Sequence, residues 1–299
     1  MIVPRLVRRS LRRGLRWRVL ALFWSALLVP SIIAALPAFA LLQRHLDHSM
    51  RAPAVMAWMD GETLFDLVRH LAEAGVSRSL LSGFAAAALC LAVLAPFTAA
   101  AMVASALSEE PLPFARLCAG AGELYGRMLR TSIAGLLPLG LAGAGAAGLV
   151  KLAEMYSRRA LTETAAMRGF VLAAALGAGL VFVGHLIVDG ARAQFAADPH
   201  RRSAAGALLA SIRLLLRWPG RMLAVGLAGT AVGFGLAAVL MALRLPIPQS
   251  GPATLAFAWL LAQAARIAIG WGRTARIEGL AELSGALSAL EPPRSGAPR

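Results

Sequence analysis

One uninterrupted apolar stretch, Gly169–Val188, reads GFVLAAALGAGLVFVGHLIV. A helix of about 20 apolar residues is long enough to cross the hydrocarbon core of a bilayer. Inside lipid every backbone N–H and C=O must find a partner within the chain, and a helix provides one for each. The only ionisable side chain in the stretch is His185. The stretch therefore predicts a membrane-spanning helix.

Five further blocks of the same kind flank this one along the chain. They are Val19–Leu42, Leu80–Ala106, Ile133–Leu152, Met222–Leu243 and Ala253–Trp271. Typical signal peptides have shorter apolar cores than the first block, so we expect that block to stay as a span. The sequence predicts an all-α integral membrane protein with six transmembrane helices.

The composition of the 299-residue chain agrees with this class. Apolar residues make up 59% and charged residues 15%, whereas soluble chains have about 25% charged residues. The mean hydropathy is +0.69. Thirty basic residues face fifteen acidic ones, but the long apolar blocks argue against a classical nucleic-acid binder. We expect membrane lipids as partners and no nucleic acid.

Basic residues set the expected orientation and the division of the chain. Residues 1–18 carry seven arginines, and positive charge stays on the cytoplasmic side. We predict a basic cytoplasmic amphipathic segment over 1–18, a six-helix transmembrane domain over 19–272 and a cytoplasmic tail over 273–299. Both termini are expected in the cytoplasm of a bacterium, with the protein in its plasma (inner) membrane. In this topology the basic segment around Lys151 and Arg168 lies on the outer side of the membrane, which agrees poorly with the positive-inside rule.

A basic amphipathic stretch precedes each of spans one, three and five. Such helices lie in the headgroup plane with their arginines on anionic lipid. The pattern favours cytoplasmic interfacial helices and three hairpin repeats, with Ser203 as an N-cap of the third helix. The arginines expected on anionic inner-leaflet lipid or on a partner are Arg12, Arg13, Arg16, Arg127, Arg130, Arg213, Arg217 and Arg221. The preferred interpretation is that these arginines serve only to set the topology, and a platform for lipid or a partner is the alternative.

Polar residues at membrane depth are the strongest functional indications in the sequence. They are His185, Asp189, Arg192, Gln263 and Arg266. Since spans four and six run in the same direction, Asp189 and Arg266 are expected to form an interhelical ion pair near the inner surface. The alternative places Arg266 among the headgroups and Asp189 at a hydrated helix end.

Small residues and prolines recur within the spans. Gly140, Ala144 and Gly148 form a small-xxx-small ladder, and Gly229 and Gly233 match G-x-x-x-G. Both patterns permit close approach of helices, within one chain or between chains. The prolines of the first three spans are expected to kink them: Pro30, Pro37, Pro96 and Pro138.

Sequence signatures of catalysis are missing. The chain contains no P-loop, H-E-x-x-H, G-x-S-x-G or C-x-x-C. Cys90 and Cys118 are expected to be packing residues. His45, His48 and His70 would bind a metal only if folding brought them together, and an outer-surface amphipathic helix over Glu62–Ala74 is the preferred interpretation. We expect no enzymatic activity, no cofactor and no metal.

Two short segments carry a resemblance. At Gly122–Arg130 and at Asp189-Gly-Ala-Arg192 the chain resembles a broad group of bacterial six-span inner-membrane proteins of uncharacterised function. That group is distantly similar to the membrane domain attached to some glycerophosphodiester phosphodiesterases. The resemblance implies a helical bundle in the plasma membrane. It implies no catalytic residues, because the phosphodiesterase chemistry belongs to a separate soluble domain.

Two functions stay open at this point. The preferred one is a non-enzymatic membrane subunit, a lipid-binding scaffold or assembly component of a complex, with a protein partner or a second copy. The alternative is a permease-like subunit of an export-type transporter driven by a separate ATPase, since six spans with short cytoplasmic helices resemble that layout.

Overall fold

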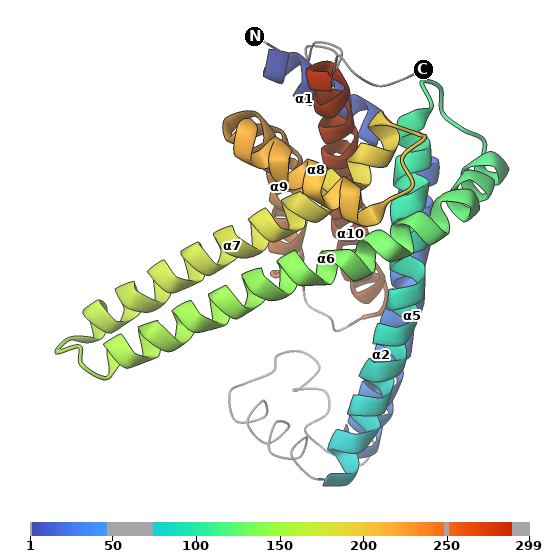
Figure 1. The fold of residues 1–299 in the computed structure, drawn as a ribbon. Helices are drawn as coiled ribbons and strands as arrows, with labels where there is room; N and C mark the ends of the chain where they lie inside the picture. Colours follow the sequence, from blue (N-terminus) through green and yellow to red (C-terminus); the bar gives the residue numbers. More distant parts are fainter. Residues whose placement is uncertain (1, 47–73, 248–250, 289–299) are drawn as a thin grey trace, which may run out of the picture. The chain divides into compact units, whose positions relative to one another are not determined.

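The computed structural model describes residues 2–46, 74–247 and 251–288 (Figure 1). Within these ranges the chain forms helices and no strand. The helices are α1 (Ile2–Gly14), α2 (Trp17–Leu46), α5 (Ala74–Leu107), α6 (Phe114–Ser157), α7 (Glu163–Ala197), α8 (Ala204–Arg217), α9 (Pro219–Arg244) and α10 (Pro252–Ser288).

Six of these helices are long and apolar enough to cross a membrane: α2, α5, α6, α7, α9 and α10. Each contains one of the six apolar blocks, so the six predicted spans are confirmed. The protein is an all-α, multi-pass membrane protein.

Separate basic helices precede the first and the fifth of the six spans. These are α1 before α2 and α8 before α9. Ser203 caps α8 as predicted, because its Oγ accepts a hydrogen bond from the Gly206 N–H at 3.1 Å.

The second expected interfacial helix is not separate, which corrects the three-repeat pattern. It forms the first turns of α6, which runs unbroken for 44 residues from Phe114. No proline or glycine pair interrupts the chain between the basic stretch and the span, so the helix continues. At about 1.5 Å per residue α6 is about 66 Å long. Part of it must therefore lie outside a hydrocarbon core that is about 30 Å thick.

The last helix also extends beyond its apolar block. α10 continues for 17 residues past Trp271, into the segment expected to be a tail. Three apolar side chains of this extension, Ile277, Leu280 and Leu283, are fully buried. Their helical spacing forms an apolar stripe that explains why the helix persists.

The chain divides into two compact units. The first contains residues 1–14, 99–229 and 274–299, and the second contains residues 15–98 and 230–273. The boundaries fall between α1 and α2 and inside α5, α9 and α10.

The first unit is built around the antiparallel pair α6 and α7, drawn in green and yellow in Figure 1. Small residues allow the two helices to approach: a Cβ added at Gly177 would lie 3.2 Å from the Cβ of Ala146. α8 packs against both helices. α1 packs on the extension of α10, where a Cβ at Gly14 would lie 2.9 Å from the backbone N of Ala275.

The second unit joins helices through similar close contacts. A Cβ at Gly233 of α9 would lie 3.0 Å from the Cα of Gly272 of α10, which confirms the predicted close approach at this glycine. A Cβ at Gly270 would lie 2.4 Å from the ring of Phe23 on α2, so α10 also packs closely on α2.

Candidate functional site

Among the described residues of the first unit, the most buried charged group is Asp189, near the C-terminal end of α7. Only 1% of its side chain is exposed. Arg192, one turn later, donates from Nη1 to Asp189 Oδ1 at 2.8 Å, and Arg276 of α10 donates from Nη2 to Asp189 Oδ2. Arg192 also reaches Ser132 of α6, with Nη2 3.3 Å from the hydroxyl oxygen. We call these four residues the Asp189 cluster.

Glycine lets α8 close over this part of α7. A Cβ at Gly190 would lie 2.3 Å from Oγ of Ser211 and 2.9 Å from Cε of Met222, so only glycine fits without movement. The Ser211 hydroxyl donates to the Ile187 carbonyl at 2.8 Å. α8 is thereby fixed on α7 beside Asp189, while the cluster itself joins α7 to α6 and α10.

The geometry of the Asp189 cluster is that of a structural ion pair. Both carboxylate oxygens of Asp189 accept from guanidinium groups, so neither is presented to a substrate. Removing charges from water is costly, and such pairs persist where geometry and extra hydrogen bonds compensate the loss. The cluster joins α6, α7 and α10 within one unit.

The expected pair between Asp189 and Arg266 is wrong, because Arg276 supplies the arginine from α10. Arg266 instead places Nη1 3.5 Å from Oε1 of Gln263 in the second unit. Ten residues separate the two arginines, which is about 15 Å along a helix and about 80° around it. The prediction failed because it ended the helix near Trp271, where the apolar block ends.

The remaining polar residues expected at membrane depth occupy different settings. Gln263 is buried, and its Oε1 accepts a hydrogen bond from Nε1 of Trp24 at 2.9 Å. His185 is exposed on α7, one turn before Asp189.

Close to the Asp189 cluster, and in the same unit, lies a cavity of about 380 Å³. We call it the arginine cavity, because its polar lining is Arg201, Arg213, Arg217, Gln194 and Ser284. The rest of the wall is Gly206, Ala210, Leu214, Trp218 and Leu287. Arg221 lies over the ring of Trp218, 4.3 Å from its centroid, and so helps to fix the ring.

The other arginines expected on lipid or on a partner have varied surroundings. Arg13 pairs with Glu282 of α10 at 3.2 Å, while Arg12 is exposed. Arg16 lies between α1 and α2, and its carbonyl accepts from the N–H of Val19 at 3.0 Å.

Two arginines of α6 bind backbone carbonyls. Arg127 donates to the Pro199 carbonyl at 3.0 Å, and Arg130 donates to the Gly126 carbonyl at 3.1 Å. Arg127 thereby ties α6 to the turn between α7 and α8.

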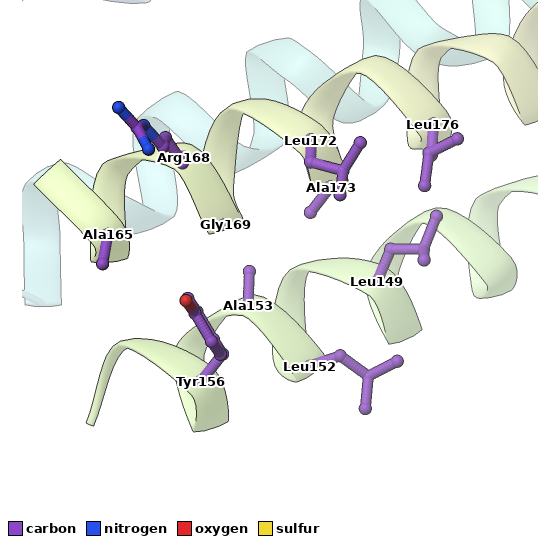
Figure 2. Close-up of a pocket in the computed structure, with 10 residues that line it drawn as sticks. All are labelled: Leu149, Leu152, Ala153, Tyr156, Ala165, Arg168, Gly169, Leu172, Ala173 and Leu176. Atoms are coloured by element: carbon purple, nitrogen blue, oxygen red, sulfur yellow. The ribbon is translucent and has the colours of Figure 1, made fainter. Parts of the chain in front are cut away.

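A second hollow, about 400 Å³, lies between α6 and α7 near the turn that connects them. Figure 2 shows its two walls, with Tyr156 on α6 and Arg168 on α7 near one end and leucines along the rest. A Cβ at Gly169 would lie 2.8 Å from the Tyr156 ring, so this glycine makes room for the tyrosine.

No group of three His, Cys, Asp or Glu side chains is placed to hold a metal within the part of the chain that the structure describes. The side chains of His45, His48 and His70 lie outside that part, as does the expected outer helix over Glu62–Ala74 apart from its last residue. Cys90 and Cys118 are free thiols and half-buried.

Sequence reasoning missed Arg276, Arg201 and the buried Gln194. The signal for Arg276 was present, since Ile277, Leu280, Leu283 and Leu287 recur at helical spacing beyond the last apolar block. Arg201 and Gln194 carried no such signal, because only the tertiary packing of α7, α8 and α10 brings them together.

Comparison of the chain with protein-family models, curated proteins and solved structures gave no match. The resemblance to the membrane domain of some glycerophosphodiester phosphodiesterases therefore stays a prediction.

Proposed function

We propose that this protein is a non-enzymatic scaffold or assembly subunit of a membrane complex, and that α6 carries its binding surface for another transmembrane helix. The observation that carries the proposal is the position of Gly140, Ala144 and Gly148. All three are exposed on α6, and a Cβ added at either glycine would meet no atom of the described residues within 4 Å. We call these three residues the open ladder.

The open ladder is separate from the contact between α6 and α7. Residues follow one another at about 100° around a helix, which puts the open ladder opposite Ala142. Ala142 is buried, and a Cβ at Gly184 of α7 would lie 3.2 Å from its methyl group. α6 thus has two faces of small residues, of which one is used within the chain and the other is open.

The chemistry of this face suits a helix in lipid. Small residues let backbones approach closely, and dispersion contacts then drive association where no hydrophobic effect operates. The leucines beside the ladder, Leu137 and Leu141, are both 68% exposed and widen the apolar face. The Asp189 cluster holds the base of the α6–α7 pair on α10, which gives a rigid mount for such a surface.

The orientation and location of the protein belong to the same proposal. The arginines of residues 1–18 support cytoplasmic termini under the positive-inside rule. The location proposed is the plasma (inner) membrane of a bacterium.

The test is native mass spectrometry of the full chain, extracted in mild detergent from its own host. Ala144→Ile with Gly148→Ile fills the open ladder, and we expect the co-purified partner or second copy to be lost. The matched control, Ala174→Ile with Ala178→Ile, adds the same bulk at exposed positions of α7 and should retain the partner.

Three results would contradict the proposal. They are a chain that is always alone, a partner that survives the ladder variant, and equal loss in both variants. Co-purification of an ATPase would instead support the permease alternative, which transport assays would then examine.

A further inference from the structure

We propose that the arginine cavity binds the phosphate group of an anionic phospholipid. This inference goes beyond the scaffold proposal, since it requires no protein partner. It concerns the cavity formed by α7, α8, the turn before α8 and the end of α10.

The first argument is an excess of positive charge. Three of the ten lining residues are arginines, and none is acidic. Arg213 forms no ion pair or hydrogen bond within the described ranges 2–46, 74–247 and 251–288. Arg201 is partly compensated, because its Nε lies 3.6 Å from the carboxylate of Asp198 and its Nη1 donates to the Gly206 carbonyl at 3.3 Å. A bound anion would neutralise the charge of Arg213.

The second argument is an amide that faces the cavity. Gln194 is 6% exposed and lines the cavity, and its side chain makes no hydrogen bond within the described part of the chain. Its amide atoms are not among the fully buried ones, so they are open to the space of the cavity. An amide both donates and accepts hydrogen bonds, and so can bind a polar group of a ligand there.

The ligand chemistry follows from these groups. Planar guanidinium groups match phosphate oxygens with paired, charge-assisted hydrogen bonds. A headgroup phosphate would accept from Arg213, Arg217 and Arg201, and the Gln194 amide would bind a hydroxyl or ester oxygen beside the phosphate. A volume of about 380 Å³ lies in the range of small-molecule sites, about 300–1,000 Å³.

The apolar half of the wall favours a lipid over free phosphate. Leu214, Leu287 and Trp218 stand beside the arginines, and tryptophan is enriched at membrane interfaces. The stacking of Arg221 on Trp218 helps to hold this wall in place. An acyl chain would pack on the apolar wall while the phosphate meets the arginines.

The experiment uses the purified full chain in detergent, with three probes: dioleoyl phosphatidylglycerol, dioleoyl phosphatidylcholine and inorganic phosphate. Native mass spectrometry counts bound lipid, and thermal unfolding reports stabilisation. We expect phosphatidylglycerol to bind with one site stronger than the rest, and to raise the unfolding temperature more than the other two probes.

Variants separate the cavity from general surface attraction. Arg213→Gln with Arg217→Gln should weaken the strong site about tenfold or more, because a tenfold change needs only about 1.4 kcal/mol. Gln194→Leu should weaken it without any change of charge. The matched control is Arg8→Gln with Arg12→Gln, which removes two exposed arginines of α1 and should leave the strong site intact.

The outcomes decide between the sources of phosphate. Equal weakening in the control, or equal binding of phosphatidylcholine, would overturn the proposal. If inorganic phosphate stabilises the chain as much as phosphatidylglycerol does, and displaces the lipid, the cavity is a site for free phosphate. That result would overturn the proposal of a lipid ligand. Because Arg213 and Arg217 are exposed, their variants should unfold at the temperature of the lipid-free parent chain. Loss of lipid without loss of partner separates this inference from the scaffold proposal.

Discussion

Arg276 of α10 donates a hydrogen bond to Asp189 of α7, although 87 residues separate them in the chain. Arg192 holds the other carboxylate oxygen, so one buried carboxylate joins two arginines. The contact fixes the extension of α10 to the end of α7, beside the arginine cavity. The order of that end of the first unit therefore depends on Asp189.

Replacing Asp189 by asparagine should destabilise the protein strongly. Asp189→Asn leaves Arg192 and Arg276 buried without their shared counter-charge, and removing one partner of a buried pair costs about 3–5 kcal/mol. The measurement is the free energy of unfolding, from titration with sodium dodecyl sulfate in mixed micelles. Asp198→Asn is the control, because its pair with Arg201 is half exposed and such pairs contribute about 0–1 kcal/mol. Equal losses in the two variants would contradict a structural role for the cluster.

Gly190 should not tolerate alanine, because of Ser211. In Gly190→Ala the new methyl group meets the Ser211 hydroxyl, and overpacking of this kind costs about 1–3 kcal/mol. Gly179→Ala is the matched control on the same helix, where an added Cβ meets nothing within 4 Å. Since alanine is the better helix former, the control should be neutral or slightly stabilising.

A double variant tests the cause of that loss. Ser211→Gly removes the two Ser211 atoms that the new methyl group would approach and leaves only Cε of Met222, at 2.9 Å. Adding it to Gly190→Ala should therefore recover part of the stability. The same unfolding titration measures the coupling between the two sites. A purely additive pair would show that contact with α8 is not what excludes alanine.

In the second unit, Gln263 should contribute through its hydrogen bond from Trp24. Gln263→Leu removes the acceptor at 2.9 Å from Trp24 Nε1, and we expect a loss of about 0.6 kcal/mol, the average between membrane helices, and of at most about 1.7 kcal/mol. Trp24→Phe and the double variant complete the cycle, read out by thermal unfolding in nanodiscs. If no coupling energy were found between residues 24 and 263, the hydrogen bond would not contribute to stability.

The six spans could be predicted from sequence because a helix that crosses lipid must be long and apolar. The composition of Gly169–Val188 meets that condition. The Ser203 cap was equally predictable, since capping is local. The ends of the helices were not. α10 leaves its apolar block at Trp271 and continues because of an amphipathic stripe, so its arginine for Asp189 lies beyond the block.

The arginine cavity was only partly predictable. Arg213 and Arg217 stood out on a basic amphipathic helix, but Arg201 and Gln194 lie on other elements. Their meeting depends on how α7, α8 and α10 pack, and no periodicity in one segment encodes that packing. The open ladder was also only partly predictable. The spacing of Gly140, Ala144 and Gly148 predicted a close helix contact. Only the structure shows that α7 packs on the opposite face of α6.

Membrane topology provides the last prediction. The positive-inside rule puts Arg5 and Gly285 in the cytoplasm, and the turn between α6 and α7 outside, although Arg158 and Arg159 place two positive charges there.

In a chain with Cys90→Ala and Cys118→Ala, we introduce Arg5→Cys, Gly285→Cys or Arg159→Cys one at a time. All three positions are exposed in the structure. A thiol reagent that does not cross the membrane should label only Arg159→Cys in intact spheroplasts, and all three after lysis. Labelling of Arg5→Cys before lysis would show that the N-terminus lies outside and that the predicted orientation is wrong. Labelling of Gly285→Cys without Arg5→Cys would mean that the number of crossings is odd, and that one of the six helices does not span the bilayer.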